Sequence, residues 1–568
     1  MVSGISVASI LLLGAWFVFI RSIAGTFQVA HGSDALAMIN ILFPVFWLFL
    51  LGYLFLSFLT IYSRSENKYL HSLQLCGLAL LLFLTPFLLS GFSWSPDSLF
   101  HGGVASYIPE IFSGEKIPLS NYAASYPASF IHTFLVEEIT GLTIFQYTLL
   151  VYPPIAIVTF TLLAYCFISQ VVDASKAFIS LLVALPALHF IELHVSPFSI
   201  GTLLILTALM TLTSKSGKVR LLFFFSILAL ILTHPVSPLS LGIFLGSALL
   251  IQVVQRFYSH HRWHNAKNVV SNISWELMFF LVICWLIWTL NWATTQYPSI
   301  NSALSRIFTL QFLRDLQLIS EFTGKGGFIY GGVQLLNLLI YGIFGILDLI
   351  VFLFSLLKFR SNTEDPHLIL SLFFSSSGLV FAVYGFSLYL GTGEHVLLGR
   401  GLLFFIFSSS ITLTLQLFQQ NQKRLKPLKQ LALFTLLTFL FITFPVNSYS
   451  KEAYNTHTPT SEAGLHFIAT TLDLSTHSIS MAASRQLASY VDLTQGLLLA
   501  PYPPPLPQTT PDYIALRINS YFLISMRYDL NFHNNTFTQL RENLEVNSMY
   551  NKIYTNSLFD LYAPVLDE

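Results

Sequence analysis

The sequence predicts a polytopic α-helical membrane protein with a small α/β domain at its C-terminal end. Of its 568 residues, 54% are hydrophobic and only 10% are charged, whereas soluble proteins carry about 25% charged residues. Apolar runs of about 17–25 residues, long enough to cross a bilayer, recur along residues 1–446. Beyond residue 446, charged, Asn and Thr residues return and no further run of that length occurs. Residues 447–568 are long enough for one small domain.

Thirteen apolar runs are expected to form transmembrane helices. They begin near residues 4, 37, 70, 146, 177, 198, 220, 237, 274, 332, 367, 398 and 428. Roughly fifteen Lys and Arg residues fall on one set of alternate connections and six on the other. Because basic connections stay in the cytoplasm, we expect an integral multi-pass protein with a cytoplasmic N-terminus and an extracytoplasmic C-terminal domain.

Two connections on the predicted outer side, residues 91–145 and 293–331, are too long to be turns. In the first, Gly114 is a candidate helix C-cap, and Tyr126-Pro127 precedes a second amphipathic stretch. In the second, apolar positions over residues 304–312 predict an interfacial helix, which a Gly-rich piece at residues 324–327 follows. We expect the chemistry of the protein to lie on these outer loops.

The C-terminal domain, residues 447–568, combines helix and strand patterns. Residues 461–472 predict an amphipathic helix, the Pro-rich residues 501–507 a rigid connector, and residues 552–562 a hairpin that turns at Asn556-Ser557. A glycosylation sequon, Asn534-Asn535-Thr536, would face the outer side.

Charge and cysteine content exclude several classes of function. The formal net charge is zero, which gives no reason to expect a nucleic-acid partner. Cys76, Cys166 and Cys284 all lie inside apolar runs, so neither a disulfide framework nor a cysteine metal site is expected.

The first outer loop begins with an acid and a histidine one helical turn apart. Ser95 is a candidate N-cap, Pro96 fits the first helical position, and Asp97 falls in the first turn, where the helix dipole favours a carboxylate. His101 shares the face of Asp97. Two interpretations stay open: Asp97 stabilises its own helix, or the helix N-terminus holds it ionised as a general base. The same geometry serves both.

Acidic residues, histidines and one arginine gather at helix ends on the predicted outer side. They are Asp97, His101, Glu110, Glu192, His194, His234, Glu394, His395 and Arg400. Each histidine could equally cap a helix end or bond a backbone carbonyl, and Tyr126 could be a structural aromatic or contact a substrate. Arg400 could reach lipid headgroups or pair with the phosphate of a lipid carrier. Their common side favours a joint site.

A metal site has weak support. His101, Glu110, His194 and His234 could be assembled into one, but no His-x-x-x-His or Asp-x-Asp spacing occurs among them. A divalent metal therefore stays an open alternative, and no other cofactor is indicated.

Several of these motifs together resemble the GT-C superfamily of membrane glycosyltransferases, especially its prokaryotic and archaeal members related to protein mannosyltransferases and oligosaccharyltransferases. The resemblance rests on the polytopic architecture, the C-terminal extracytoplasmic domain, and Asp97-x-x-x-His101, Asn121-Tyr122, Ser125-Tyr126-Pro127, Gly141-Leu142, His234-Pro235 and Arg400. It implies an inverting sugar transfer from a polyprenyl-phosphate or dolichol-phosphate donor to a protein, lipid or glycan acceptor. Asp97 would be the catalytic base and Arg400 would hold the leaving phosphate. His101, Glu110, Tyr126, His234, Glu394 and His395 would complete the substrate pocket.

Two departures from that superfamily narrow the expectation. Two spans precede the one before the candidate catalytic loop, whereas many members place this loop after the first span, and the tail contains no Trp-Trp-Asp signature. Single-sugar transfer is therefore favoured over oligosaccharide transfer. The main alternative is a transporter or flippase of lipid-linked glycans, which would show a hydropathy repeat and ionisable residues within spans. A structural scaffold is a third alternative, but it explains neither the polar cluster nor the large early loop.

Overall fold

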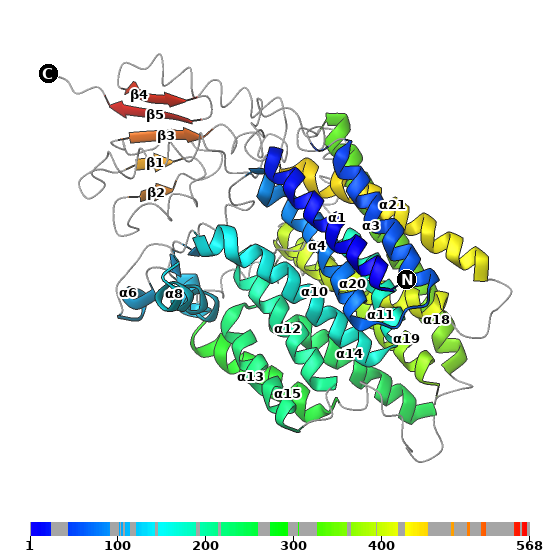
Figure 1. The fold of residues 1–568 in the computed structure, drawn as a ribbon. Coiled ribbons are helices and arrows are strands. Elements are labelled where there is room, and N and C mark those ends of the chain that lie inside the picture. Colours follow the sequence, from blue (N-terminus) through cyan, green and yellow to red (C-terminus); the bar gives the residue numbers. More distant parts are fainter. Residues whose placement is uncertain are drawn as a thin grey trace.

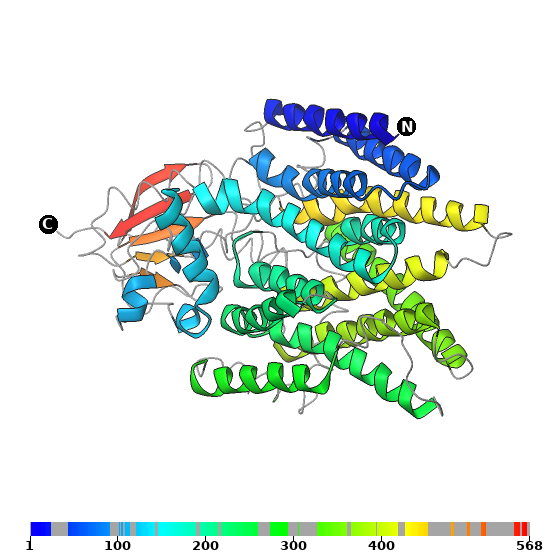
Figure 2. The same ribbon diagram turned by 60° about the horizontal axis from the view of Figure 1, so that its bottom comes forward.

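The structure is a computed structural model of the chain. It describes residues 2–23, 42, 44–90, 101–102, 104–105, 108–113, 121–142, 146–188, 194–213, 217–258, 273–293, 305, 327–359, 365–392, 395–418, 426–452, 479–481, 497–499, 513–517, 550–556 and 559–564. In these residues a bundle of long helices carries, at one end, a group of short helices and a small β-sheet (Figures 1 and 2).

Each of the thirteen predicted apolar runs coincides with a helix of the bundle. Eight of these helices are long and apolar enough to cross a membrane, so the chain is an integral, multi-pass membrane protein. They are α1 (Val2–Ile23), α3 (Val45–Tyr62), α4 (Lys68–Ser90), α10 (Tyr152–Val171), α14 (Ser237–Tyr258), α18 (Gly327–Phe359), α19 (Pro366–Thr392) and α20 (His395–Leu417).

Five further helices coincide with the remaining apolar runs, but their apolar parts are shorter. They are α11 (Ala174–Ala184), α12 (Pro197–Thr213), α13 (Gly217–Thr233), α15 (Trp275–Asn291) and α21 (Lys426–Glu452), whose apolar part is Lys429–Pro445. The count of thirteen spans therefore stays a prediction.

One helix starts later than the hydropathy pattern predicts, and a proline directly precedes it. The second run was expected from residue 37, but α3 starts at Val45, directly after Pro44, because a proline fixes its own φ and offers no N–H to a preceding helical turn. The fourth run was expected from residue 146, where Gln146 is indeed helical. A π-helical turn, η1 (Tyr147–Val151), leads from it directly into α10, whose first turn contains Pro153 and Pro154.

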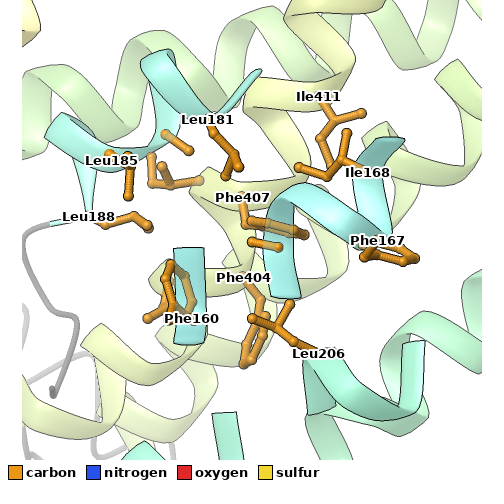
Figure 3. Close-up of a cluster of buried hydrophobic side chains, with 14 of the residues drawn as sticks. Phe160, Phe167, Ile168, Leu181, Leu185, Leu188, Leu206, Phe404, Phe407 and Ile411 are labelled. Atoms are coloured by element: carbon orange, nitrogen blue, oxygen red, sulfur yellow. The ribbon is translucent and has the colours of Figure 1, made fainter. Parts of the chain in front are cut away.

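The centre of the bundle is rich in phenylalanine. Phe160 and Phe167 of α10 face Phe404 and Phe407 of α20 across this core (Figure 3), and the rings of Phe167 and Phe407 stack with their centroids 6.3 Å apart. In the span of α20, 78% of residues are buried, against 22% in the span of α1. Helix α20 is therefore a central element, whereas most of α1 is left to face lipid.

Three short helices of the first long loop lie at one end of the bundle: α6 (Ile108–Ser113), α7 (Asn121–Ser125) and α8 (Ala128–Thr140). They share a small apolar cluster that includes Val104, Ile108 and Phe130. Pro127 separates α7 from α8, and Gly141, with φ of 69°, ends α8 in the left-handed conformation that glycine favours. The amphipathic stretch predicted after Tyr126-Pro127 is thus confirmed, whereas the predicted cap Gly114 lies outside the described residues.

A five-stranded sheet lies beyond the same end of the bundle (Figure 1). Its strands are β1 (Ile479–Met481), β2 (Leu497–Leu499), β3 (Tyr513–Arg517), β4 (Tyr550–Asn556) and β5 (Phe559–Pro564), in the order β2-β1-β3-β5-β4. Strands β2, β1 and β3 pair in parallel, and β5 pairs antiparallel with both β3 and β4.

The hairpin predicted at residues 552–562 is confirmed, because β4 and β5 form it and Asn556 pairs with Phe559 at its tip. The helix predicted at residues 461–472, the connector at 501–507, the interfacial helix at 304–312 apart from the backbone of Ser305, and the sequon at Asn534 lie outside the described residues. Cys76, Cys166 and Cys284 are free thiols.

Candidate functional site

The most specific polar contact at the loop-bearing end of the bundle joins Arg400 to His234. Arg400 lies in the second turn of α20, and His234 lies in the turn between α13 and α14. Arg400 Nη1 is 3.0 Å from His234 Nε2. A guanidinium nitrogen can only donate, so Nε2 accepts and the neutral ring carries its hydrogen on Nδ1.

The other ring nitrogen of His234 has two neighbours. The Ser237 hydroxyl and the Val236 backbone nitrogen both lie 3.2 Å from Nδ1. Because the contact with Arg400 places the hydrogen on Nδ1, we assign the hydrogen bond to Nδ1–H donating to Ser237 Oγ, and not to an N–H of Val236 donating to the ring.

Electrostatics keep His234 neutral. Burial lowers the pKa of His234 well below its usual range, and the nearby Arg400 and His101 lower it further. A neutral imidazole can accept from the guanidinium without neutralising its positive charge.

Phe198 supports both members of this pair. Its ring centroid lies 4.9 Å from Arg400 Cζ, within the range of a cation–π interaction, and 5.6 Å from the ring of His234. Phe198 is the second residue of α12, which starts with a strong capping pattern. The Ser196 hydroxyl accepts from the Ser199 N–H at 3.0 Å, and Pro197 occupies the first helical position. This cap fixes the start of α12 and therefore the position of Phe198 in its first turn.

The backbone of the His234 turn is held from two further helices. The indole N–H of Trp285 on α15 donates to the Pro235 carbonyl at 3.3 Å, and the Tyr384 hydroxyl on α19 donates to the Val236 carbonyl at 3.4 Å. On α12, a Cβ at Gly201 would collide with the Ser237 hydroxyl, so glycine permits the close approach of α12 to α14 here.

Arg400 and Tyr384 reach the turn because their helices cross beside them. A Cβ added at Gly401 would lie 2.7 Å from the Gly385 nitrogen and 3.1 Å from the Phe381 carbonyl oxygen. The backbones of α19 and α20 therefore touch at Gly385 and Gly401, as small residues permit in membrane helices. Arg400 is the neighbour of one glycine and Tyr384 of the other.

The first long loop brings its own aromatic residues to this end of the bundle. The half-buried ring of His101 lies 5.5 Å from that of Phe130 on α8, and Trp288 of α15 donates to the Ser125 carbonyl at 2.9 Å. Tyr126 is buried, which raises its pKa to about 12, and its hydroxyl has no hydrogen-bond partner among the described residues. The loop is thus anchored to the membrane bundle through α15.

The structure brings together part of the predicted polar cluster. His234 and Arg400 are in contact and His101 is near them, while His194 is buried just before α12. The remaining members are not described: Asp97, Glu192 and Glu394 lie outside the described residues, as do the side chains of Glu110 and His395. In the part of the chain that the structure describes, no group of three His, Cys, Asp or Glu residues could hold a metal ion.

Several residues around the site escaped the sequence analysis. Phe198, Trp285 and Tyr384 lie within apolar stretches, where an aromatic residue gives no signal of a polar role. His132 is another: its Nε2 lies 2.7 Å from the Tyr147 hydroxyl, and burial lowers its pKa. A search for histidine and tryptophan at helix ends on the outer side would have found His132 and Trp288, but not Phe198.

Comparisons with known proteins add a likeness of fold. No protein-family model matches the chain, and no curated protein is significantly similar to it in sequence. Among solved structures, the archaeal oligosaccharyltransferase AglB from Archaeoglobus fulgidus, in complex with an inhibitory peptide and a dolichol-phosphate, is similar with a TM-score of 0.44 and 11% identity, over 88% of this chain and 74% of that one. ArnT from Cupriavidus metallidurans, bound to undecaprenyl phosphate, is similar with a TM-score of 0.46 and 13% identity, over 87% of this chain and 98% of that one. Likeness at this level does not extend to activity or to individual residues.

Proposed function

We propose that the protein is a membrane glycosyltransferase that moves a sugar from a polyprenyl-phosphate carrier to an extracytoplasmic protein, lipid or glycan acceptor. The observation that carries this proposal is the Arg400 guanidinium, which neutral His234 and Phe198 hold at the end of a helix otherwise buried in the bundle. An arginine in such a place is costly and is a candidate binding residue by default.

The chemistry of a lipid-linked phosphate fits this position. Guanidinium pairs with phosphate oxygens in a planar, bidentate way. The apolar helices that surround the site would allow the polyprenyl chain to stay in the membrane while its phosphate meets Arg400. With the N-terminus in the cytoplasm, as the Lys and Arg bias predicts, this end of the bundle is extracytoplasmic.

The proposed reaction needs one base and one anion-binding group. The oxygen of an acceptor hydroxyl attacks the anomeric carbon, and the bond from that carbon to the phosphate oxygen breaks with inversion. Asp97 takes the hydroxyl proton, and the polyprenyl phosphate leaves with the electron pair. Arg400 offsets the charge that develops on the phosphate. We place His101, Glu110, Tyr126, His234, Glu394 and His395 around the two substrates.

A binding experiment tests the role of Arg400. The full-length protein in lipid nanodiscs is titrated with undecaprenyl phosphate and, separately, with the uncharged alcohol undecaprenol. We expect Arg400→Met to weaken phosphate binding about 10- to 100-fold, the range of a charge-assisted hydrogen-bonded pair, and to leave alcohol binding unchanged. Arg256→Met, at the last turn of α14, is the matched control and should bind both lipids as the wild type does. Equal phosphate binding by Arg400→Met and wild type would remove Arg400 from the site.

A second measurement separates sugar transfer from flipping. Extracts containing polyprenyl-phosphate-linked sugars are incubated with the protein in detergent, where no membrane side exists. A transferase releases free polyprenyl phosphate in step with glycosylated acceptor. A flippase leaves the sugar-phosphate bond intact, and that result would overturn the proposal.

A further inference from the structure

Asp348 is a buried acid inside a membrane span, and the proposed function makes no use of it. It lies in α18, within the apolar segment Leu339–Phe359, and only 1% of its surface is exposed. A carboxylate in this setting costs free energy unless a cation or hydrogen bonds compensate for its lost hydration. Its neighbours therefore define its chemical state.

Three helices meet at Asp348. Its Oδ2 lies 2.6 Å from the Ser409 hydroxyl on α20. On α19, a Cβ at Gly378 would collide with Oδ2, so glycine is needed for the carboxyl group to fit. The carboxyl group thus sits in a closed space between α18, α19 and α20.

The number of hydrogens at Ser409 indicates which group donates. The Ser409 oxygen is 2.6 Å from Asp348 Oδ2 and also 2.8 Å from the Phe405 carbonyl oxygen, one turn back in its own helix. A carbonyl and a carboxylate both only accept, and a serine hydroxyl has a single hydrogen. With Asp348 ionised, one of the two contacts would have no hydrogen. With Asp348 protonated, its O–H donates to Ser409 and the serine donates to Phe405.

Thr412, one turn further along α20, also bonds its own helix. Its hydroxyl donates to the Ser408 carbonyl oxygen at 3.1 Å. Hydroxyls that bond the carbonyl four residues back commonly give their hydrogen to that carbonyl. Neither hydroxyl is therefore a dedicated donor to a carboxylate. The 2.6 Å separation is that of an O–H···O hydrogen bond.

The described ionisable groups on the packed helices lie too far along their axes to compensate a negative charge. On α18 itself, the rise of about 1.5 Å per residue places Tyr341 about 10 Å and Lys358 about 15 Å from Asp348 along the helix axis. On α19, Tyr384 is about 9 Å and His367 about 16 Å from the level of Gly378. On α20, Arg400 is about 13 Å from Ser409, and on α21, Lys429 is in the first turn.

We propose that Asp348 is a proton-binding site within the membrane, in which a neutral carboxylic acid donates to Ser409 and joins α18 to α20. The bound proton is a structural ligand, since one hydrogen completes the set of donors at the three-helix junction. Arg400 lies on the same helix as Ser409, about two and a half turns away, so the junction also fixes the helix that carries the candidate site.

Infrared spectroscopy of the full-length protein in lipid detects the proton directly. A protonated carboxyl group gives a C=O stretching band that an ionised one lacks. At neutral pH, we expect Asp348→Asn to remove one such band from the wild-type spectrum. Asp365→Asn is the matched control, because Asp365 caps the first turn of α19 at the bundle end and its Oδ1 accepts from the His367 N–H. If the band is the same in Asp348→Asn and wild type, Asp348 is ionised and the proposal is wrong.

Thermal unfolding provides an independent outcome. An asparagine amide is neutral and can donate to Ser409, so Asp348→Asn should keep the wild-type midpoint. Asp348→Ala and Ser409→Ala each remove one partner and should lower the midpoint by about 2–4 °C. If Asp348→Asn lowers the midpoint as much as Asp348→Ala does, the negative charge is required and the proposal fails.

Discussion

Replacing Gly401 with alanine should separate α19 from α20 and release Arg400 from His234. The new Cβ would lie 2.7 Å from the Gly385 nitrogen, and this atom belongs to backbone that cannot rotate away. Heavy atoms of this kind pack at about 3.5–4.0 Å. The helices must therefore move apart by about 0.8 Å or more at the crossing.

That movement is large compared with the tolerance of the adjacent contact. The Arg400 Nη1 to His234 Nε2 separation is 3.0 Å, and the same displacement would lengthen it to about 3.8 Å, outside hydrogen-bonding range. Overpacking costs about 1–3 kcal/mol, and the lost bond to a charged group adds about 1.5–3 kcal/mol. The gain of about 1 kcal/mol from replacing a helical glycine with alanine offsets only part of this.

The matched control is Gly342→Ala, because no atom lies within 4 Å of the position a Cβ would take on α18. We expect Gly401→Ala to lower the midpoint of thermal unfolding in detergent and to weaken undecaprenyl phosphate binding, while Gly342→Ala leaves both unchanged or raises the midpoint. If the two variants have equal midpoints, the helices do not touch at Gly401 and the reasoning fails.

Three further predictions concern residues around the site. His234→Gln keeps an acceptor for Arg400 but removes the titratable ring. The folded pKa of His234 lies below its ordinary value of about 6.5. The contribution of His234 to stability is therefore complete above about pH 6.5 and is lost as the pH falls through the folded pKa. The wild-type midpoint should therefore drop more steeply than that of the variant between pH 7 and pH 5. Asp97→Asn should abolish sugar transfer and leave the unfolding midpoint unchanged. Trp288→Phe removes the hydrogen bond to the Ser125 carbonyl and should destabilise the protein by about 0.5–1.5 kcal/mol.

Each of these predictions has its own control and contrary result. His367→Gln, on the exposed first turn of α19, is the control for replacing a histidine with glutamine. A His234→Gln profile parallel to wild type would contradict the assigned neutral state. Wild-type turnover in Asp97→Asn would remove Asp97 from the role of base. Trp292→Phe, at an exposed tryptophan that stacks on Trp288, should destabilise less than Trp288→Phe. An equal loss would mean that aromatic packing matters more than the hydrogen bond.

The helices could be predicted from the sequence because their signal is long and repeated. Apolar runs near residues 237, 274 and 367 led to helix starts at Ser237, Trp275 and Pro366, since hydropathy over some twenty residues averages out local exceptions. The start of α3 was missed by eight residues, because apolar residues lie on both sides of Pro44, which directly precedes the helix.

The candidate site was only partly predictable. His234 and Arg400 carry polar groups at helix ends, and their gathering could be inferred from topology alone. Their direct contact could not be predicted, because it depends on the crossing of α19 and α20 at Gly385 and Gly401. Neither glycine belongs to a recognisable motif. Asp348 is an ionisable residue within a span that the sequence analysis did not identify, and the contacts that explain it lie on two other helices, where no local pattern could indicate them.

The composition of α20 has a consequence for how the protein enters the membrane. Of the eight described spans it has the lowest hydropathy, it includes Arg400 and three consecutive serines at residues 408–410, and most of it faces protein. Such a segment gains little from lipid alone, because Arg400, Ser409 and Gln416 have partners on other elements of the bundle. Helix α19 ends at Thr392 and α20 starts at His395, so the two can be delivered to the bilayer as a preformed helical hairpin. We therefore expect the membrane insertion of α20 to depend on α19, and we expect substitutions in α19 that lie far from the site to reduce the insertion of α20.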